Sequence, residues 1–270
     1  MIIQHNVTSM NANRQLGMVG KNLQKSTEKL SSGYRINRAA DDAAGLSISE
    51  KMRSQIRGLN RASDNAQDGI SMIQTAEGAL EQQHAILQRA RELVVQASNT
   101  ATLDEDTGDF QKIQDELDQL KAEYNAINST AEYNKKKLLA NNVQDEYLQV
   151  GANSAQGIKI TITSANWDGV TLVPGTGDGN SGFLEDVDDK ISAVSSARSN
   201  LGAIQNRLEY RIKVDDNTAE NLQSAESLLR DTDMADEMTR FSKESILQQA
   251  ATSMLAQANQ ANQGVLSLLQ

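Results

Sequence analysis

The stretch that decides the fold is residues 59–97, LNRASDNAQDGISMIQTAEGALEQQHAILQRARELVVQA, in which apolar residues recur every seven positions. One set of positions holds Leu59, Ala66, Ile73, Leu80, Leu87 and Val94, and a second set, three residues further on, holds Ala62, Gly69, Ala76, Gln83, Ala90 and Ala97. These are the a and d positions of a coiled coil. A helix over residues 46–98 would be about 80 Å long, at about 1.5 Å per residue. The repeat therefore predicts an elongated helical rod rather than a short amphipathic helix in a globular core.

Four further segments carry apolar residues at steps of three and four, which is the spacing of one helical face. They are residues 110–127, residues 187–229, the C-terminal segment with Ile246, Met254, Val265 and Leu268, and the N-terminal segment with Leu16, Val19, Leu23 and Leu30. The N-terminal and C-terminal segments lie at opposite ends of the sequence. Pairing them would bring both termini together, so we expect a mainly α fold in which the terminal helices are partners.

The middle of the chain departs from the helical pattern. Ile158, Ile160 and Ile162 alternate with polar residues, which indicates a half-buried strand. Asp168-Gly169 is a hairpin signal ahead of 170–173, and PGTGDGNSG at 174–182 is rich in turn formers. We expect a small β-hairpin excursion between the two helical halves.

The composition excludes several classes of site. The 270 residues include no cysteine, one proline and only nine aromatic side chains, so the interior should be narrow and built from Ala, Leu and Ile. Without cysteine there is no disulfide, zinc–thiolate site or thiol nucleophile. The two histidines, His5 and His84, belong to no catalytic motif, and DEDTGD at 104–109 lacks the glycine of a calcium-binding loop. We therefore expect no catalytic, cofactor or metal site.

Charge is distributed unevenly along the chain. Residues 1–60 hold nine Lys or Arg and four acids, whereas the whole chain has a formal net charge of −10. A basic arm on an acidic body suits nucleic-acid binding or complementary packing between copies of one protein. The arm has one aromatic residue, Tyr34, and no nucleic-acid motif, which favours packing between copies. There is no apolar run long enough for a membrane span, and the start of the chain does not have the pattern of a signal peptide.

Several motifs at both ends resemble bacterial flagellin. In the first half they are KLSSGYRINRAADDAAGLSISEKMRSQIRGL (29–59), NAQDGISMIQTAEGAL (65–80) and LQRARELVVQASN (87–99). In the second half they are GAIQNRLE (202–209), NLQSAESLLRDTDMADEM (221–238) and MLAQANQANQGVLSLL (254–269). The central region, where flagellins vary most, is short. The chain therefore resembles a minimal flagellin with little or no variable outer domain.

The resemblance implies a structural function. Flagellins are exported unfolded, polymerise into the flagellar filament and support swimming motility; their partners are other subunits, an export chaperone, and cap and junction proteins. The implied domains are 1–44 as the N-terminal arm of an inner (D0) coiled coil with a connecting loop, 45–135 as the first half of the D1 rod, 136–185 as the β excursion, 186–231 as the C-terminal D1 helix and 232–270 as the C-terminal D0 arm. The implied location is the secreted filament, or the periplasm in a spirochete. The alternative within this resemblance is a hook–filament junction protein.

Some flagellins are also recognised by the innate immune receptor TLR5, through an LQRxREL motif and the helix that follows it. The matching candidates for receptor contact here are Gln88, Arg89, Glu92, Leu93 and Glu116. The commoner FNGxKLL pattern is replaced by YNKKKLL at 133–139, with Lys135 in place of the glycine. This substitution is expected to alter the turn before the β excursion and to affect receptor activation separately from binding.

Overall fold

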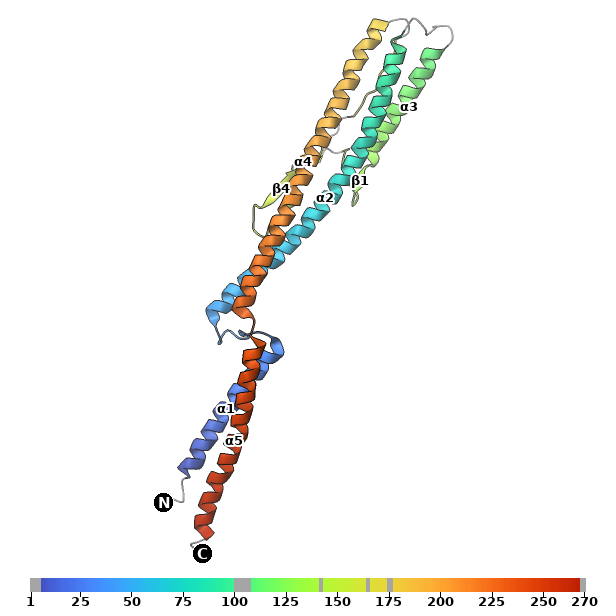
Figure 1. Ribbon diagram of the computed structural model, residues 1–270. Helices are drawn as coiled ribbons and strands as arrows, with labels where there is room; N and C mark the ends of the chain where they lie inside the picture. Colours follow the sequence, from blue (N-terminus) through green and yellow to red (C-terminus); the bar gives the residue numbers. More distant parts are fainter. Residues whose placement is uncertain (1–5, 100–107, 141–142, 164–165, 174–176, 268–270) are drawn as a thin grey trace. The chain divides into compact units, whose positions relative to one another are not determined.

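The computed structural model of the chain describes residues 6–99, 108–140, 143–163, 166–173 and 177–267, apart from the side chains of 177–179 and 261–267. Three helices come first, then four short strands, then two helices, as the prediction of a mainly α fold with a small β excursion requires (Figure 1). In chain order the elements are α1 (Val7–Ser32), α2 (Ala43–Ala97), α3 (Asp109–Thr130), β1 (Glu132–Tyr133), β2 (Lys136–Lys137), β3 (Glu146–Gln149), β4 (Gly157–Ile160), α4 (Gly177–Arg230) and α5 (Met234–Ser267). None of the described helices is both long and apolar enough to cross a membrane.

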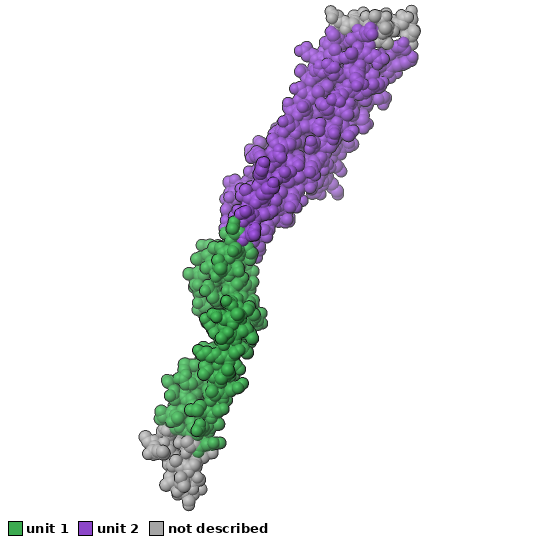
Figure 2. Space-filling model, in the orientation of Figure 1, with its two compact units in different colours: residues 1–54, 221–270 green, residues 55–220 purple. Residues whose placement is uncertain are grey.

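The chain divides into two compact units (Figure 2). Unit 1 consists of residues 1–54 and 221–270, and contains α1, α5 and the adjoining ends of α2 and α4. Unit 2 consists of residues 55–220. Both divisions between the units fall inside long helices.

The core of unit 2 follows the predicted heptads of α2. All the residues at the predicted a and d positions are buried, with exposed fractions of 0–5% wherever the side chain is larger than hydrogen. α3 and α4 run beside α2 (Figure 1) and contribute their own apolar stripes, including Leu117 and Tyr124 from α3 and Leu201 and Leu208 from α4. A bundle of long helices therefore buries the stripe that the sequence predicted.

The β excursion differs from the predicted hairpin. The strand at Ile158 and Ile160 is confirmed, but its partner is β3, with Leu148 opposite Ile158 in an antiparallel pair. Among the described residues, 166–173 form no strand. The predicted hairpin turn at Asp168-Gly169 is not formed either, although Gly169 has a left-handed φ of 78°.

Amide side chains of α3 explain why 166–173 stays outside the sheet. Gln114 donates to the Val170 carbonyl at 2.9 Å and accepts from the Leu172 N–H at 2.8 Å. Asn125 donates to the Trp167 carbonyl at 3.0 Å in the same way. These contacts satisfy backbone groups that a strand would otherwise bond, while Trp167, Val170 and Leu172 are buried in the core.

Unit 1 is built on an antiparallel pair of helices, as predicted for the two ends of the chain (Figure 1). α1 is capped at its start by Asn6, whose side-chain oxygen accepts from the Ser9 N–H at 3.0 Å, and at its end by Gly33, which has a left-handed φ of 75°. At one end of the pair the Asn6 side chain donates to the Ala258 carbonyl at 2.9 Å. At the other end the Thr232 N–H donates to the Gly33 carbonyl at 2.9 Å.

Candidate assembly and receptor-binding surfaces

The inner face of α5, which packs on α1, mixes apolar and polar residues. Its least exposed residues recur at steps of four and three, as expected for a paired helix. They are Glu237, Phe241, Glu244, Gln248, Ala251, Leu255 and Ala258, and Ser245 beside Glu244 is also half-buried. Three of the seven are polar, and Oε2 of Glu244 is buried without a hydrogen-bond partner among the described residues. The α1 pairing therefore uses little of the apolar surface that α5 carries.

The apolar residues of α5 lie mainly on the outside. Ile246 is 66% exposed and Met254 is 61% exposed, and Met238 and Ala250 in the same row are also exposed. We call these four residues the outer stripe. A row of exposed apolar side chains at helical spacing is typical of a surface that another helix covers.

The predicted assembly residues thus fall into two groups. Leu16, Val19, Leu23 and Leu30 of α1 are half-buried, whereas Ile246 and Met254 of α5 are exposed. The apolar stripe that the sequence predicted for the C-terminal helix is therefore not the face of α5 that contacts α1. Val265 lies in α5 but its side chain is outside the described residues, and so is Leu268.

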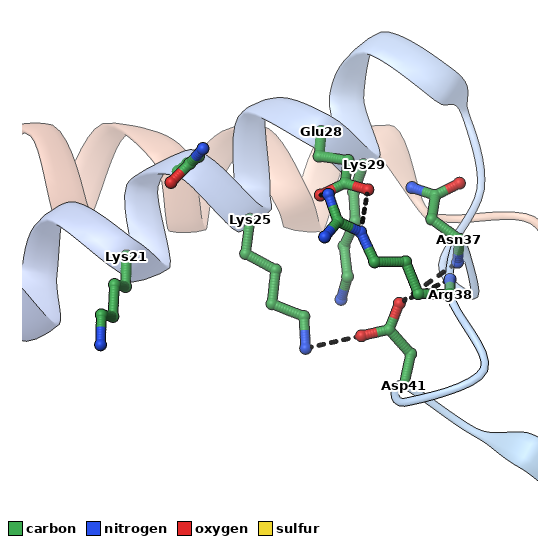
Figure 3. A pocket seen from close by; sticks show the side chains of 8 residues that line it. Lys21, Lys25, Glu28, Lys29, Asn37, Arg38 and Asp41 are labelled. Atoms are coloured by element: carbon green, nitrogen blue, oxygen red, sulfur yellow. Dashed lines mark hydrogen bonds and ion pairs between the residues drawn. The ribbon is translucent and has the colours of Figure 1, made fainter.

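A groove lined by charged side chains lies between α1 and the segment that follows it (Figure 3). Its volume is about 290 Å³. Lys25 pairs with Asp41 at 2.8 Å and Arg38 pairs with Glu28 at 2.9 Å. The Lys25 ammonium and the backbone N–H of Arg38 hold the pKa of Asp41 at about 2. Lys21, in the same wall of the groove, makes no ion pair with a described residue.

The predicted receptor residues lie mostly on one exposed face of unit 2. Arg89 pairs with Glu92 at 3.0 Å and with Glu116 at 2.9 Å, which joins α2 to α3. These two carboxylates, hydrogen-bonded to the guanidinium, raise the pKa of Arg89. The side-chain amide of Gln88 lies 3.0 Å from His84 Nε2, one turn earlier on α2. Four of the five predicted residues are therefore available on the surface.

Leu93 is the exception among the five. It is 2% exposed and belongs to the unit 2 core. Its neighbour Val95, which the motif does not include, is exposed on α2 instead. Leu93 can therefore support the shape of this face but cannot itself touch a partner of the folded bundle.

The turn between β1 and β2 survives the loss of its usual glycine. Asn134 and Lys135 have φ values of 50° and 64°, both in the left-handed region, as in a two-residue type I′ hairpin. Lys136 pairs with Glu146 and Lys137 pairs with Glu132 on either side. Lys135 therefore adopts a backbone conformation that favours glycine.

Within the part of the chain that the structure describes, no three or more His, Cys, Asp or Glu side chains are grouped so that they could hold a metal ion. The predicted loop residues 104–107 lie outside the described residues. Asp109 forms the first turn of α3 and pairs with Lys112 at 3.0 Å.

Comparison with known proteins identifies the family. Residues 3–144 match the bacterial flagellin N-terminal helical region, and residues 184–269 match the bacterial flagellin C-terminal helical region. Flagellin of Halalkalibacterium halodurans is 51% identical over the whole of both chains, and flagellin of Bacillus subtilis is 48% identical, also over both whole chains. The flagellar filament 31.3 kDa core protein of Treponema maltophilum is 45% identical with the same coverage. A crystal structure of Bacillus cereus flagellin aligns with a TM-score of 0.46 at 22% identity, covering 56% of this chain and 88% of that one.

Helical termini matched at both ends, full-length identity of about half to flagellins and a short central β excursion lead to one conclusion: this chain belongs to the bacterial flagellin family.

Proposed function

We propose that this flagellin joins its neighbours in the flagellar filament through the outer stripe of α5. That it is a structural subunit of the filament follows from its family, and the hook–filament junction alternative is not favoured. The observation that carries the proposal is the exposure of Ile246 and Met254 on the side of α5 that does not contact α1. Covering two such side chains is worth about 1.5–3 kcal/mol each, which rewards addition of a subunit to the growing end.

On this account, the inner arms are residues 1–44 and 232–270, and residues 45–135 with 186–231 form the surrounding rod, with 136–185 as the excursion. Leu16, Val19, Leu23 and Leu30 hold α1 against α5. Ile246 and Met254 face other copies, and Val265 and Leu268 remain candidates for the same contact.

Seeded elongation tests the role of the outer stripe. Ile246→Glu with Met254→Glu is expected to stop growth on filament seeds, because it places two charges where apolar contact is required. The matched control, Ile246→Leu with Met254→Leu, is expected to elongate. A chain truncated after residue 245 should stay largely helical yet not polymerise. Elongation of the glutamate variant at the control's rate would contradict the proposal.

Before assembly, the outer stripe needs protection. The exposed apolar row supports binding of an export chaperone before assembly. In the filament, neighbouring subunits would cover the same row, and at the ends of the filament the cap and junction proteins would do so. Capture of the full chain by its cognate chaperone should fail for the chain truncated after residue 245. If the truncated chain is still captured, the chaperone binds a surface outside residues 246–270.

A receptor role for the Arg89 face is a second candidate function. The observation that favours it is that Gln88, Arg89, Glu92 and Glu116 share an exposed surface, organised by the two ion pairs of Arg89. Arg89→Ala in the monomer is expected to lower signalling by cells that carry TLR5. Arg61→Ala is the matched control, because Arg61 is also exposed on α2 and pairs with Asp64 one turn later. Equal signalling by both variants would remove Arg89 from the contact.

The variant Lys135→Gly tests whether receptor activation can be separated from receptor binding. Glycine at this position restores the commoner turn sequence. If the turn governs activation, Lys135→Gly raises signalling at unchanged receptor affinity. A parallel change in both quantities would assign Lys135 to the binding surface.

The family is structural, and we propose that the chain has no enzymatic activity. We also propose that it is exported from the cytoplasm into the filament. Immunogold labelling of intact cells distinguishes an external filament, which is labelled, from a periplasmic one, which is labelled only after the outer membrane is opened.

A further inference from the structure

Unit 1 carries a row of three lysines, of which only the middle one makes a described ion pair. Lys21, Lys25 and Lys29 follow one another at four-residue spacing on α1 and so share one face of the helix. We call these three residues the lysine row. The row spans about 12 Å at about 1.5 Å per residue. In Figure 3 the ammonium of Lys25 reaches Asp41, whereas Lys21 extends beside it without a partner.

The lysine row is flanked by grooves on two sides. The first groove, described above, has Lys21, Lys25 and Lys29 in its wall. A second groove, of about 340 Å³, shares Lys25 and Lys29 and adds Arg240, Lys243 and two acids from α5. The row is therefore accessible to a partner from either side.

The cations of the two grooves outnumber the acids that pair with them. Arg38, Lys25 and Arg240 make ion pairs with Glu28, Asp41 and acids of α5. Lys21, Lys29 and Lys243 make none with the described residues. These three ammonium groups are available to carboxylates from outside the chain.

A complementary surface lies at the start of α5. Residues 231–237, DTDMADE, hold four acids and no Lys or Arg. Asp231, Asp233 and Asp236 are exposed, and we call these three residues the acidic turn. Among the described residues, their one ion pair is that of Asp236 with Arg240, at 4.0 Å within the same helix. No described ion pair joins the lysine row to the acidic turn of the same chain.

We propose that the lysine row of one subunit binds the acidic turn of a second copy of this chain. The inference rests on the filament function and adds a named electrostatic contact to it. The argument is charge complementarity between Lys21 and Lys29, which make no described ion pair, and Asp231, which makes none either and accepts a hydrogen bond from the Ser227 hydroxyl at 2.6 Å. A contact repeated head-to-tail along the filament would use both patches of every subunit, one toward each neighbour. Attraction between such patches mainly speeds and orients subunit addition.

A charge swap tests this contact with seeds of wild-type filament and with seeds grown from each variant. Lys21→Glu with Lys29→Glu is expected to slow elongation about tenfold or more, and Asp231→Lys with Asp236→Lys is expected to do the same. Asp233 is kept, because its side chain caps α5 by accepting from the N–H groups of Ala235 and Asp236. The chain with all four changes should elongate on its own seeds within about threefold of the wild-type rate.

The controls separate this inference from the filament function. Lys135→Glu reverses an exposed lysine of unit 2 and is expected to elongate like wild type. Wild-type elongation in the same assay tests the filament function alone. Circular dichroism identifies a reversed variant that does not fold, and Lys21→Gln with Lys29→Gln then gives a milder change, with elongation expected to slow about threefold.

Three results would overturn the proposal. In the first, both reversals slow growth but the four-change chain is not rescued on its own seeds. In the second, Lys135→Glu slows growth as much as the lysine-row reversal does, which would make net charge the cause. In the third, inorganic pyrophosphate binds wild-type monomer and not the lysine-row variant, while elongation is equal. The row would then be a small-anion site.

Discussion

The guanidinium of Arg230 lies over the ring of Tyr34, 4.7 Å from its centroid, and its Nη1 atom lies 2.7 Å from a carboxylate oxygen of Glu50. Arg230 is the last residue of α4, Tyr34 follows α1, and Glu50 belongs to α2. The backbone reinforces this contact, because the Arg35 N–H donates to the Arg230 carbonyl at 2.7 Å. One side chain therefore ties together three segments of unit 1.

This contact predicts a measurable coupling between Tyr34 and Arg230. Cation–π contacts that are partly shielded from water are worth about 1–2 kcal/mol. Tyr34→Leu and Arg230→Met should each lower the temperature at which filaments dissociate, and the double variant should lose less than the sum of the two. Additive losses in this double-mutant cycle would show that the ring and the guanidinium act independently.

Two glycines of α2 should respond to alanine in opposite ways. A Cβ at Gly58 would lie 2.9 Å from the Cβ and 3.2 Å from the Cα of Ala152, whereas a Cβ at Gly78 would meet nothing within 4 Å. Gly78→Ala should raise the free energy of unfolding by about 1 kcal/mol through helix propensity. The free energy of unfolding of Gly58→Ala should be about 1–3 kcal/mol lower than that of Gly78→Ala, because the added methyl group overpacks against Ala152. Urea unfolding of the monomers measures both, and equal gains would mean that the 151–155 loop simply moves away.

Replacing Lys135 with glycine should make unit 2 more stable. A side chain in the left-handed region costs about 1 kcal/mol relative to glycine, so Lys135→Gly should stabilise unit 2 by about that amount. Lys136→Gly is the control, because Lys136 is in strand β2 and pairs with Glu146, and it should destabilise instead. Thermal unfolding of both monomers tests the sign. A destabilised Lys135→Gly variant would mean that the lysine side chain makes a favourable contact.

Low pH should reduce the stabilisation that ionised Asp41 gives to the segment after α1. The pKa of Asp41 is lowered from 3.8 to about 2, so the folded state binds this proton more weakly than the unfolded state does. The stabilisation from Asp41 is therefore complete above about pH 4 and is lost as the pH falls towards 2. Carbon-13 NMR of the Asp41 carboxyl should show the low midpoint, and Lys25→Met should raise it. A midpoint near 3.8 in the wild-type chain would show that the Lys25 contact does not persist in solution.

The sequence predicted the helical framework well because burial in this framework is periodic. The heptads of residues 59–97 identified the buried face of α2, including Gln83, whose amide donates to the Tyr124 carbonyl at 3.3 Å. The N-terminal stripe Leu16, Val19, Leu23 and Leu30 is likewise half-buried on α1, which pairs with α5 as predicted. In both cases the apolar spacing marks a face that a neighbouring helix covers within the chain.

Elsewhere the pattern could not reveal which partner satisfies a group. Residues 170–173 alternate like a strand, yet the Gln114 side chain replaces the strand that they would need. The outer stripe of α5 was visible as apolar spacing, but spacing alone does not distinguish a face that meets α1 from one that meets another copy. Leu93 shows the converse, since its motif marks a surface while its side chain lies in the core.

The central claim is that the outer stripe of α5 is an interface between subunits, and electron cryomicroscopy of filaments grown from the purified chain tests it most directly. The side chains of Ile246 and Met254 should be covered by helices of neighbouring copies, while Phe241 and Leu255 remain against α1 of their own chain. A filament in which Ile246 and Met254 still face solvent would contradict the account.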